Sequence, residues 1–278
     1  MGDVITICNN KGGVGKTFMV WAMATYLRER YNASVCCIDL DNQGSLSNTL
    51  IKKYLGMEDD DDLFEIQEYS GTPAKNLFLT ETDLGKIRPM TNHQGIDFFY
   101  TEPNDYSAID IFNPRPGEED RMEHFARALD LLRPRYDYIL LDVPPAANRQ
   151  KVTAIYLADY VVIPLQCASH STIATEGEID MLQRVGCLDK FLGIVINHVQ
   201  RHSMRHRRKV AKLRRVFGEV FFKTTIHISV AIDTATDLNV PLTSVPGGYT
   251  ARREVEAVLE EILERIAQKK AQNTQDRR

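Results

Sequence analysis

The sequence predicts an α/β protein in three layers, with helices on both faces of a mostly parallel, twisted sheet. Short apolar runs at residues 4–8, 35–38 and 138–141 each lead into polar residues, which is typical of buried parallel strands. Helical patterns alternate with such runs along the chain. We expect a single domain over residues 1–270, followed by a polar, frayed tail at residues 271–278.

The first strand leads into a glycine-rich loop and a helix start. Backbone N–H groups of such a loop, together with the helix dipole, can face an anion. Lys16 would place an ammonium against terminal phosphates, and the Thr17 hydroxyl can ligate Mg²⁺. The glycine spacing is one residue short unless the loop is counted from Asn10, which then stands where glycine is expected. The residues expected to contact a phosphate ligand are Lys11, Gly12, Gly13, Val14, Gly15, Lys16, Thr17 and Phe18.

Carboxylates follow the next two strands. Asp39 and Asp41 alternate with a leucine, so both can point the same way. Asp41 is suited to orient a water near a terminal phosphate or to ligate the metal, whereas capping of a helix at residues 45–55 explains only one of the pair. Asp142 ends the third strand before two prolines and would hold Mg²⁺ opposite Thr17. Parallel strands bind ligands at their carboxyl ends, which all these residues occupy.

The rest of the chain continues the alternation. We expect a helix at residues 16–30 with Trp21 off its apolar face, and a solvated loop at the five consecutive acids of residues 58–62. Asn197 ends a buried strand, where its amide could read a base or make a turn. The further elements expected are strands at 96–100, 160–165 and 192–197, helices at 118–132, 172–185 and 252–267, a loop at 113–117, and a short helix with a strand-like end at 226–242.

Charge is distributed unevenly along the chain. The net charge of −4 argues against nucleic-acid binding over the whole surface. Residues 201–215, however, contain eight Lys or Arg and no acid. Val210, Leu213 and Phe217 fall on one side of the helix expected here, so the cations project from the other sides. This basic stripe predicts binding to a polyanion through Arg201, Arg205, Arg207, Arg208, Lys209, Lys212 and Arg215.

Cysteine usage and hydropathy indicate the compartment. The five cysteines are odd in number, lack the spacing of a metal site and lie mostly in apolar strand-like runs. We therefore expect reduced core thiols in a cytosolic protein. No apolar run reaches the length of a transmembrane helix and no signal peptide is visible, so we expect a cytoplasmic protein without a membrane partner.

Three motifs together resemble those of the deviant Walker A ATPases of the ParA/MinD group. They are KGGVGKT with Lys11, the strand end DLDNQGS and the strand end DVPPA. Their order and spacing fit from about residue 3 to residue 267. VVIPLQC followed by a helix, and FGEVFFKTTI followed by a short helix, are similar to the ParA/Soj-type partition ATPases in particular.

The resemblance implies a weak, Mg²⁺-dependent ATPase that forms a homodimer around ATP. Lys11 would reach across to the partner's phosphates, whereas Lys16 and Thr17 would act within their own subunit. Asp41 would position the attacking water, and Asp142 would hold the magnesium shell. The ATP-bound dimer would bind double-stranded DNA without sequence preference on the nucleoid. A ParB-like partner would stimulate hydrolysis and so release the DNA.

The chain departs from the family in several places. Phe18 follows the loop where a small hydroxyl residue is usual, Asn42 replaces a proline, and His227 and Ala231 stand where relatives often carry arginines that contact DNA. The resemblance therefore does not imply a second DNA contact at these positions.

The alternatives are a ParA-like positioner of non-DNA cargo and a MinD-like membrane-cycling ATPase, which needs an amphipathic C-terminal helix that residues 268–278 do not supply. A reductase of the same fold would need bridging cysteines, and an amidating enzyme of this fold is a further alternative.

Overall fold

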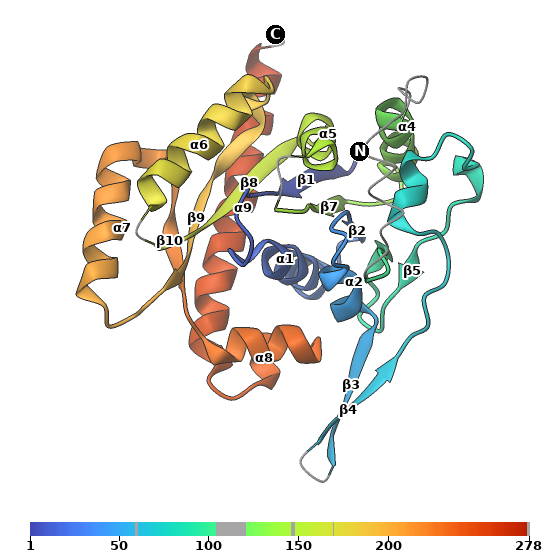
Figure 1. Cartoon of the computed structure of the whole chain (residues 1–278), viewed down its shortest axis with the longest axis horizontal. Coiled ribbons are helices and arrows are strands. Elements are labelled where there is room, and N and C mark those ends of the chain that lie inside the picture. Colours follow the sequence, from blue (N-terminus) through green and yellow to red (C-terminus); the bar gives the residue numbers. More distant parts are fainter. Residues whose placement is uncertain (59–60, 104–120, 146–147, 169, 277–278) are drawn as a thin grey trace.

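Eight strands form a central sheet in the order β10-β9-β8-β1-β7-β2-β6-β5 (Figure 1). The computed structural model describes residues 1–58, 61–103, 121–145, 148–168 and 170–276. Every neighbouring pair in this sheet is parallel except β5 with β6, which confirms the expected mostly parallel α/β sheet. The strands are β1 (Asp3–Ile7), β2 (Val35–Asp39), β5 (Met90–Thr91), β6 (Asp97–Phe99), β7 (Tyr138–Asp142), β8 (Tyr160–Gln166), β9 (Phe191–Val199) and β10 (Phe221–His227).

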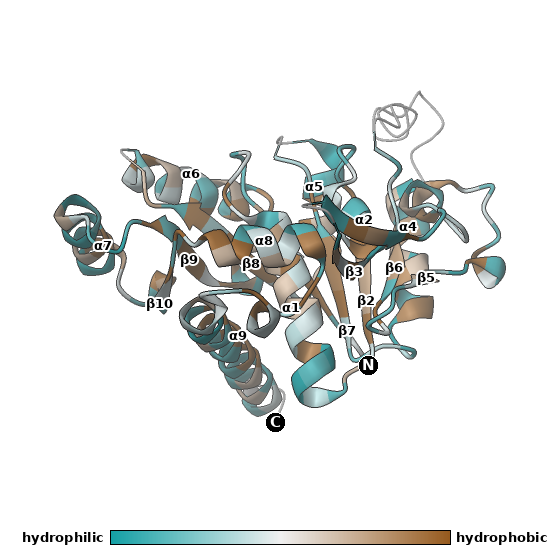
Figure 2. Ribbon diagram, turned by 90° about the horizontal axis from the view of Figure 1, so that it is seen from below, coloured by the Kyte–Doolittle hydropathy of each residue, from teal (hydrophilic) through white to brown (hydrophobic). Residues whose placement is uncertain are grey.

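Helices cover both faces of this sheet, as expected; α5 and α6 lie on one side and α1 and α9 on the other (Figure 2). One face carries α1 (Lys16–Tyr31), α2 (Ser45–Leu50), α8 (Val230–Leu238) and α9 (Gly248–Asp276). The opposite face carries α4 (Arg121–Leu132), α5 (Arg149–Leu157), α6 (Ser171–Arg184) and α7 (Met204–Phe217). Short 3₁₀ turns are η1 (Ala74–Phe78), η2 (Leu84–Lys86), η3 (Leu188–Lys190), η4 (Gly218–Val220) and η5 (Leu242–Ser244).

Alternation along the strands divides the hydrophobic core in two. In β1, Ile5 and Ile7 pack in the core under α1 and α9, while Val4 and the neighbouring Cys8 pack in the core under α4 and α5. This is the period of two that a strand buried on both faces requires. All five cysteines are buried free thiols, as the sequence led us to expect. No helix in the described part of the chain is long and apolar enough to cross a membrane.

The expected helix at residues 45–55 is wrong beyond Leu50. Instead, β3 (Lys52–Glu58) and β4 (Asp61–Ile66) form an antiparallel hairpin that extends away from the sheet (Figure 1). The rings of Tyr54 and Phe64 meet across the two strands at 5.8 Å, an aromatic cross-strand pair that favours a hairpin. The expected acidic loop is also wrong where it is described, because Glu58 ends β3 and Asp61 and Asp62 begin β4, all three exposed. Residues 59–60 lie outside the described residues.

The C-terminal helix is longer than predicted. It begins at Gly248 and continues to Asp276 instead of ending at Ala267. The polar end does pack in part, because Lys270 Nζ lies 2.7 Å from a carboxylate oxygen of Asp3. The expected frayed tail is therefore helical as far as Asp276, and residues 277–278 lie outside the described part.

Other boundaries shift for local reasons. The strand-like end expected near Leu242 is the 3₁₀ turn η5, and the segment before α8 forms the strand β10. Trp21 covers the end of α8, as its position off the apolar face of α1 suggested, since its indole N–H donates to Asn239 Oδ1 at 2.8 Å. The expected loop at 113–117 and the first residues of the helix expected at 118–132 lie outside the described residues. The predicted strands at 96–100, 160–165 and 192–197 are found with ends shifted by at most two residues.

Candidate phosphate-binding site

The loop between β1 and α1 curls around an open space. Gly13 and Gly15 have φ angles of 68° and 94°, which residues with a side chain rarely adopt. A Cβ atom built on Gly12 or Gly13 would meet nothing within 4 Å. Gly15 is different, because a Cβ there would lie 2.3 Å from Asn197 Nδ2. The loop is therefore open on the side where an anion would contact its backbone and closed against β9.

Lys16 lies inside this curl. The residue is only 7% exposed, and its ammonium donates to the carbonyl oxygen of Lys11 at 3.3 Å. Burial lowers the pKa of Lys16, and the nearby carboxylates of Asp142 and Asp41 oppose that change. A buried ammonium whose hydrogen bond, within the described part of the chain, goes to one carbonyl is well placed to bind a phosphate oxygen.

Thr17 and Asp142 meet as the sequence predicted. The Thr17 hydroxyl donates to Asp142 Oδ2 at 2.7 Å, and the other oxygen, Oδ1, is buried with no hydrogen-bond partner among the described residues. Burial is the main reason why the pKa of Asp142 lies well above its usual range, and the nearby carboxylate of Asp39 raises it further. A buried, unpartnered carboxylate oxygen beside a threonine hydroxyl is a donor set that fits Mg²⁺, whose preferred ligands are oxygens.

Asp39 and Asp41 have different surroundings. Asp39 is buried and accepts hydrogen bonds from the N–H of Asp41 at 3.1 Å, and from the N–H and hydroxyl of Ser47 at 2.9 and 2.7 Å. It therefore fixes the start of α2. Asp41 is half-buried, and among the described residues its carboxylate accepts the N–H of Gln43, at 3.1 Å. Of the pair, Asp41 alone remains available to the loop.

Asn197 braces the loop from β9. Its amide nitrogen donates to the carbonyl of Val14 at 3.0 Å, and its amide oxygen accepts the N–H of His198 at 2.8 Å. The residue is buried and holds no turn of its own, since β9 continues to Val199. Contact of Asn197 with a base stays a prediction.

Lys11 and Phe18 lie on opposite sides of the loop. Lys11 is exposed, and its ammonium donates to Gln166 Oε1 at the end of β8, at 2.7 Å. Phe18 is 9% exposed and belongs to the core under α1. It borders a cleft of about 390 Å³ between the loop and α8. This cleft is also lined by Gly13, Asn197 and Asp233. It therefore continues directly from the loop between β1 and α1, hereafter the phosphate loop.

Two residues behind the loop, Lys151 and Glu178, were not predicted from the sequence. Asn10, at the start of the loop, contacts Lys151 of α5 and Glu178 of α6, both of which are buried. A single lysine in one helix and a single glutamate in another carry no local pattern that marks them. Only the fold brings them together.

The basic stripe lies largely on α7, at the edge of the sheet beyond β10 (Figure 1). Val210 and Leu213 are buried, as expected, and Phe217 is half-buried. Several of the predicted cations also bind within the protein: Arg201 lies 2.5 Å from Glu254, Lys209 donates to the carbonyl of Ala168, and Arg207 donates to the carbonyl of Arg201 at 3.2 Å. The exposed cations of the stripe are Arg201, Arg205, Arg207, Arg208, Lys212 and Arg215.

The positions where relatives often have arginines lie on two elements. His227 ends β10 and does not belong to the following helix, and its Nδ1 lies 3.0 Å from Glu254 Oε1. Ala231 is buried in α8. Neither residue presents a cation to the surface in the way that an arginine would.

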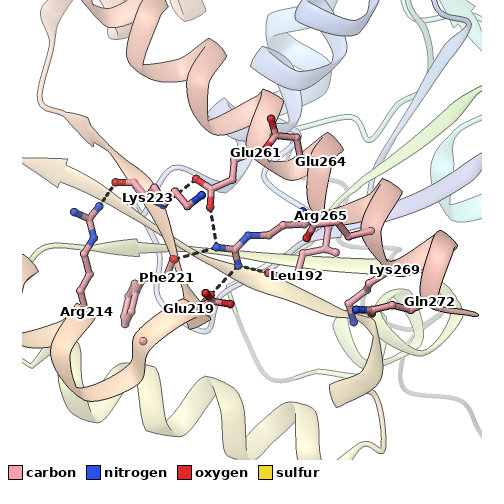
Figure 3. A pocket seen from close by; sticks show the side chains of 12 residues that line it. Leu192, Arg214, Glu219, Phe221, Lys223, Glu261, Glu264, Arg265, Lys269 and Gln272 are labelled. Atoms are coloured by element: carbon pink, nitrogen blue, oxygen red, sulfur yellow. Dashed lines mark hydrogen bonds and ion pairs between the residues drawn. The ribbon is translucent and has the colours of Figure 1, made fainter.

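A second charged region lies between β10 and α9, in a groove of about 560 Å³ (Figure 3). The guanidinium of Arg265 donates to the carbonyls of Leu192, Glu219 and Phe221 at 2.6, 2.9 and 3.1 Å, and it pairs with Glu261 at 2.8 Å. Glu261 in turn accepts the N–H of Lys223 at 2.8 Å. These contacts satisfy backbone groups at the outer edge of the sheet, which protects β10 from pairing with another strand.

Comparison with known proteins identifies the family. A family model described as an AAA domain matches residues 2–194, more than two thirds of the chain. The chain belongs to this family. The sporulation initiation inhibitor protein Soj of Bacillus subtilis is 27% identical over 252 residues, which cover 87% of this chain and 90% of that protein. The chromosome-partitioning ATPase Soj of Treponema pallidum is 25% identical over 278 residues, covering 97% and 100%.

Solved structures share the fold of this chain. An ATP complex of McdA from Cyanothece is similar with a TM-score of 0.74 at 20% identity, covering 94% of this chain and 96% of that chain. At this identity the likeness speaks for the fold alone. Together with the family match and the Soj relatives, it confirms the expected resemblance to ParA/MinD-type ATPases.

Proposed function

We propose that this AAA-family chain is a Mg²⁺-dependent ATPase that partitions DNA: its ATP-bound dimer binds DNA without sequence preference and releases it after hydrolysis. The observation that carries the nucleotide part is the Thr17–Asp142 contact beside an unpartnered buried carboxylate oxygen, next to glycines that face open space. A chromosome-partitioning ATPase among the relatives supports the choice of DNA as cargo.

The triphosphate would lie along the open side of the loop. Backbone N–H groups from Gly12 to Thr17 and the ammonium of Lys16 would bind its oxygens, and Mg²⁺ would sit between Thr17, Asp142 and the phosphates. The cleft of about 390 Å³ beside Phe18 and Asn197 offers room for the nucleoside. Bound Mg²⁺ supplies charge neutralisation at the terminal phosphates.

Hydrolysis would depend on Asp41 and Lys11. The half-buried carboxylate of Asp41 is close enough to Lys16 to oppose the lowering of that lysine's pKa, so it can orient a water toward the same phosphate. Lys11 is exposed, and among the described residues its ammonium donates to Gln166, a contact at the surface that costs little to break when Lys11 turns toward the phosphates of a second subunit. The nucleotide would then become part of the dimer interface.

DNA would bind the exposed cations of α7. Arg208, Lys212 and Arg215 recur every three to four residues and share one face of the helix. Cations in such a row contact the phosphate backbone without reading bases. In this proposal the protein works on the nucleoid, and a ParB-like partner stimulates hydrolysis.

A DNA-shift assay with ATP, ADP or no nucleotide, at two salt concentrations, tests the proposal together with light scattering. ATP, but neither ADP nor the absence of nucleotide, should produce dimers and a shifted DNA band. The shift should weaken steeply at the higher salt, because the lysine and arginine side chains that bind DNA phosphates release counterions from the DNA. A monomer that ignores adenine nucleotides would overturn the proposal. Dimers that form with ATP but never shift DNA would favour a ParA-like positioner of another cargo, and dimers that bind vesicles would favour a MinD-like cycle.

A further inference from the structure

Two opposite charges are buried directly behind the phosphate loop. Lys151 of α5 is 1% exposed and Glu178 of α6 is 3% exposed, and Lys151 Nζ lies 3.6 Å from Glu178 Oε2. Removing two such charges from water is costly, and their mutual attraction alone often does not recover that cost. A buried pair at this place therefore calls for a role beyond stabilising the fold.

Both charges converge on one residue, Asn10. The Lys151 ammonium donates to Asn10 Oδ1 at 2.8 Å, and Glu178 Oε1 accepts the backbone N–H of Asn10 at 2.7 Å. Asn10 is itself exposed, so water could have satisfied both of its groups. It is also the residue that stands where the first glycine of the phosphate loop is expected. A side chain at this position therefore gives the loop an anchor that glycine could not provide.

The neighbouring residue is held in a similar way. Asn9 donates from its amide to the carbonyl of Pro164 in β8 at 2.8 Å, and its amide oxygen accepts the N–H of Lys11 at 2.7 Å. The start of the loop is thus tied to β8, α5 and α6, on the side opposite α1. The charge of Lys151 also reaches the site itself: burial is the main cause of the lowered pKa of Lys16, and Lys151 adds to it.

We propose that the Lys151–Glu178 pair is a positioning device that fixes Asn10, and through it holds the phosphate loop in the shape that receives a phosphate. The inference rests on the proposed nucleotide binding. Lys151 and Glu178 touch no reacting atom; they act through Asn10. The loop is then preorganised before the ligand arrives, which raises affinity because less ordering is left to occur on binding.

The experiment measures two properties of each variant. The first is hydrogen exchange of the peptide that spans residues 8–15 in nucleotide-free protein, which needs no ligand. The second is affinity for ATP and for ADP by calorimetry, well below the unfolding temperature. The variants are Lys151→Met, the double variant Lys151→Met/Glu178→Gln, which removes both charges and so avoids an unpaired buried carboxylate, and Asn10→Ala.

Arg133→Met is the matched control. Arg133 pairs with Asp159 at 2.5 Å with 16% of its side chain exposed, at the amino-terminal ends of β1 and β8, the edge of the sheet opposite the phosphate loop. This variant should lower the unfolding temperature without changing exchange at residues 8–15 or nucleotide affinity. It separates general destabilisation from an effect on the loop.

The double variant should fold, exchange residues 8–15 about tenfold faster and bind both nucleotides about tenfold more weakly. In the Asn10→Ala background, the same two substitutions should change exchange at residues 8–15 and nucleotide affinity little further, because the three residues act as a unit. Unchanged exchange in the double variant would overturn the inference, whether or not the protein binds nucleotide. Wild-type protein that shows protected loop amides but no affinity for ATP would instead overturn the proposed function.

Discussion

The phosphate loop and the groove between β10 and α9 are both lined with charged side chains, but their charges are partnered differently. In the groove, the guanidinium of Arg265 contacts three carbonyls and a carboxylate, and Glu261 holds a backbone N–H as well. At the loop, a buried oxygen of Asp142 has no partner in the described part of the chain, and Lys16 contacts a single carbonyl.

The hydrogen-bond partners of a buried charge indicate whether the charge has a structural role or is available to a ligand. Leaving a buried polar atom without a partner costs about 1–3 kcal/mol, so such an atom is expected where a ligand completes the contacts. Arg265 and Glu261 in the groove already have such contacts within the protein and gain little from a ligand. Substitutions at the loop should therefore reduce ligand binding, whereas substitutions in the groove should reduce stability.

Lys16→Gln should abolish binding of ATP, with a loss of affinity above about 100-fold. The substitution removes the ammonium that lies inside the loop, and a neutral amide cannot replace its attraction for the terminal phosphates. Calorimetry with ATP and ADP measures the loss, and circular dichroism should show that the fold is retained. Affinity equal to that of the parent would refute the phosphate-binding role of the loop.

Reversing the charge of Arg208, Lys212 and Arg215 to Glu should weaken DNA binding by about 10²–10³-fold and reduce its salt dependence. ATP-driven dimerisation should persist, because α7 lies away from the phosphate loop (Figure 1). The DNA-shift assay and light scattering measure the two properties separately. A triple variant that still shifts DNA at the parent concentration would remove α7 from the proposed interface.

Asp41→Ala should slow ATP hydrolysis by about 100-fold while ATP still binds, because the substitution removes the carboxylate expected to orient water but none of the groups expected to bind phosphate. The ATP-bound dimer should accumulate and be visible by light scattering. Asp39→Ala is the comparison variant: it should instead destabilise the protein, since Asp39 fixes the start of α2. Turnover at the parent rate would count against Asp41.

Arg265→Met should lower the free energy of unfolding by about 2 kcal/mol, because Glu261 and the carbonyls at the sheet edge lose a charged donor. Nucleotide affinity should not change, because the groove takes no part in the proposed site. Urea unfolding and calorimetry test both statements. A change in ATP affinity without a change in stability would contradict the contrast between the two regions.

Asp142→Asn should raise the free energy of unfolding of the nucleotide-free protein by about 1 kcal/mol at pH 8. Asn can still accept the Thr17 hydroxyl, but it carries no buried charge. Because the pKa of Asp142 is higher in the folded than in the unfolded protein, the folded protein holds this proton more tightly. The contribution of Asp142 to stability therefore falls as the pH rises from the unfolded pKa through the folded one.

The increase in the free energy of unfolding caused by Asp142→Asn should accordingly be smaller at pH 5 than at pH 8. Urea unfolding at the two values measures it. The same variant should lose the extra stability that Mg²⁺ and ATP together give the parent. Equal destabilisation at both pH values would show that the ionised carboxylate has a partner in the folded protein after all.

Local sequence patterns predicted much of the fold and part of the site. The loop, the Thr17–Asp142 pair and most strands follow from glycine chemistry, from polar residues at strand ends and from apolar runs, which are short-range properties. The same reasoning failed at residues 52–66, because an aromatic pair across two strands depends on residues ten apart. It also ended the last helix at residue 267, whereas α9 continues to Asp276 and its Lys270 pairs with Asp3 near the other end of the chain.

Neighbouring residues alone predicted a glycine-rich loop after the first strand, Asp142 at the end of a buried strand and a basic stripe after residue 200. The tertiary structure alone decided which of these charges keep a partner. It assigned Asp39 to α2 and left Asp41 half-exposed, and it brought Lys151 and Glu178 from two helices onto Asn10. The physical reason is that burial and partnering are set by packing between distant segments, whereas strand ends and glycine turns are set by neighbouring residues.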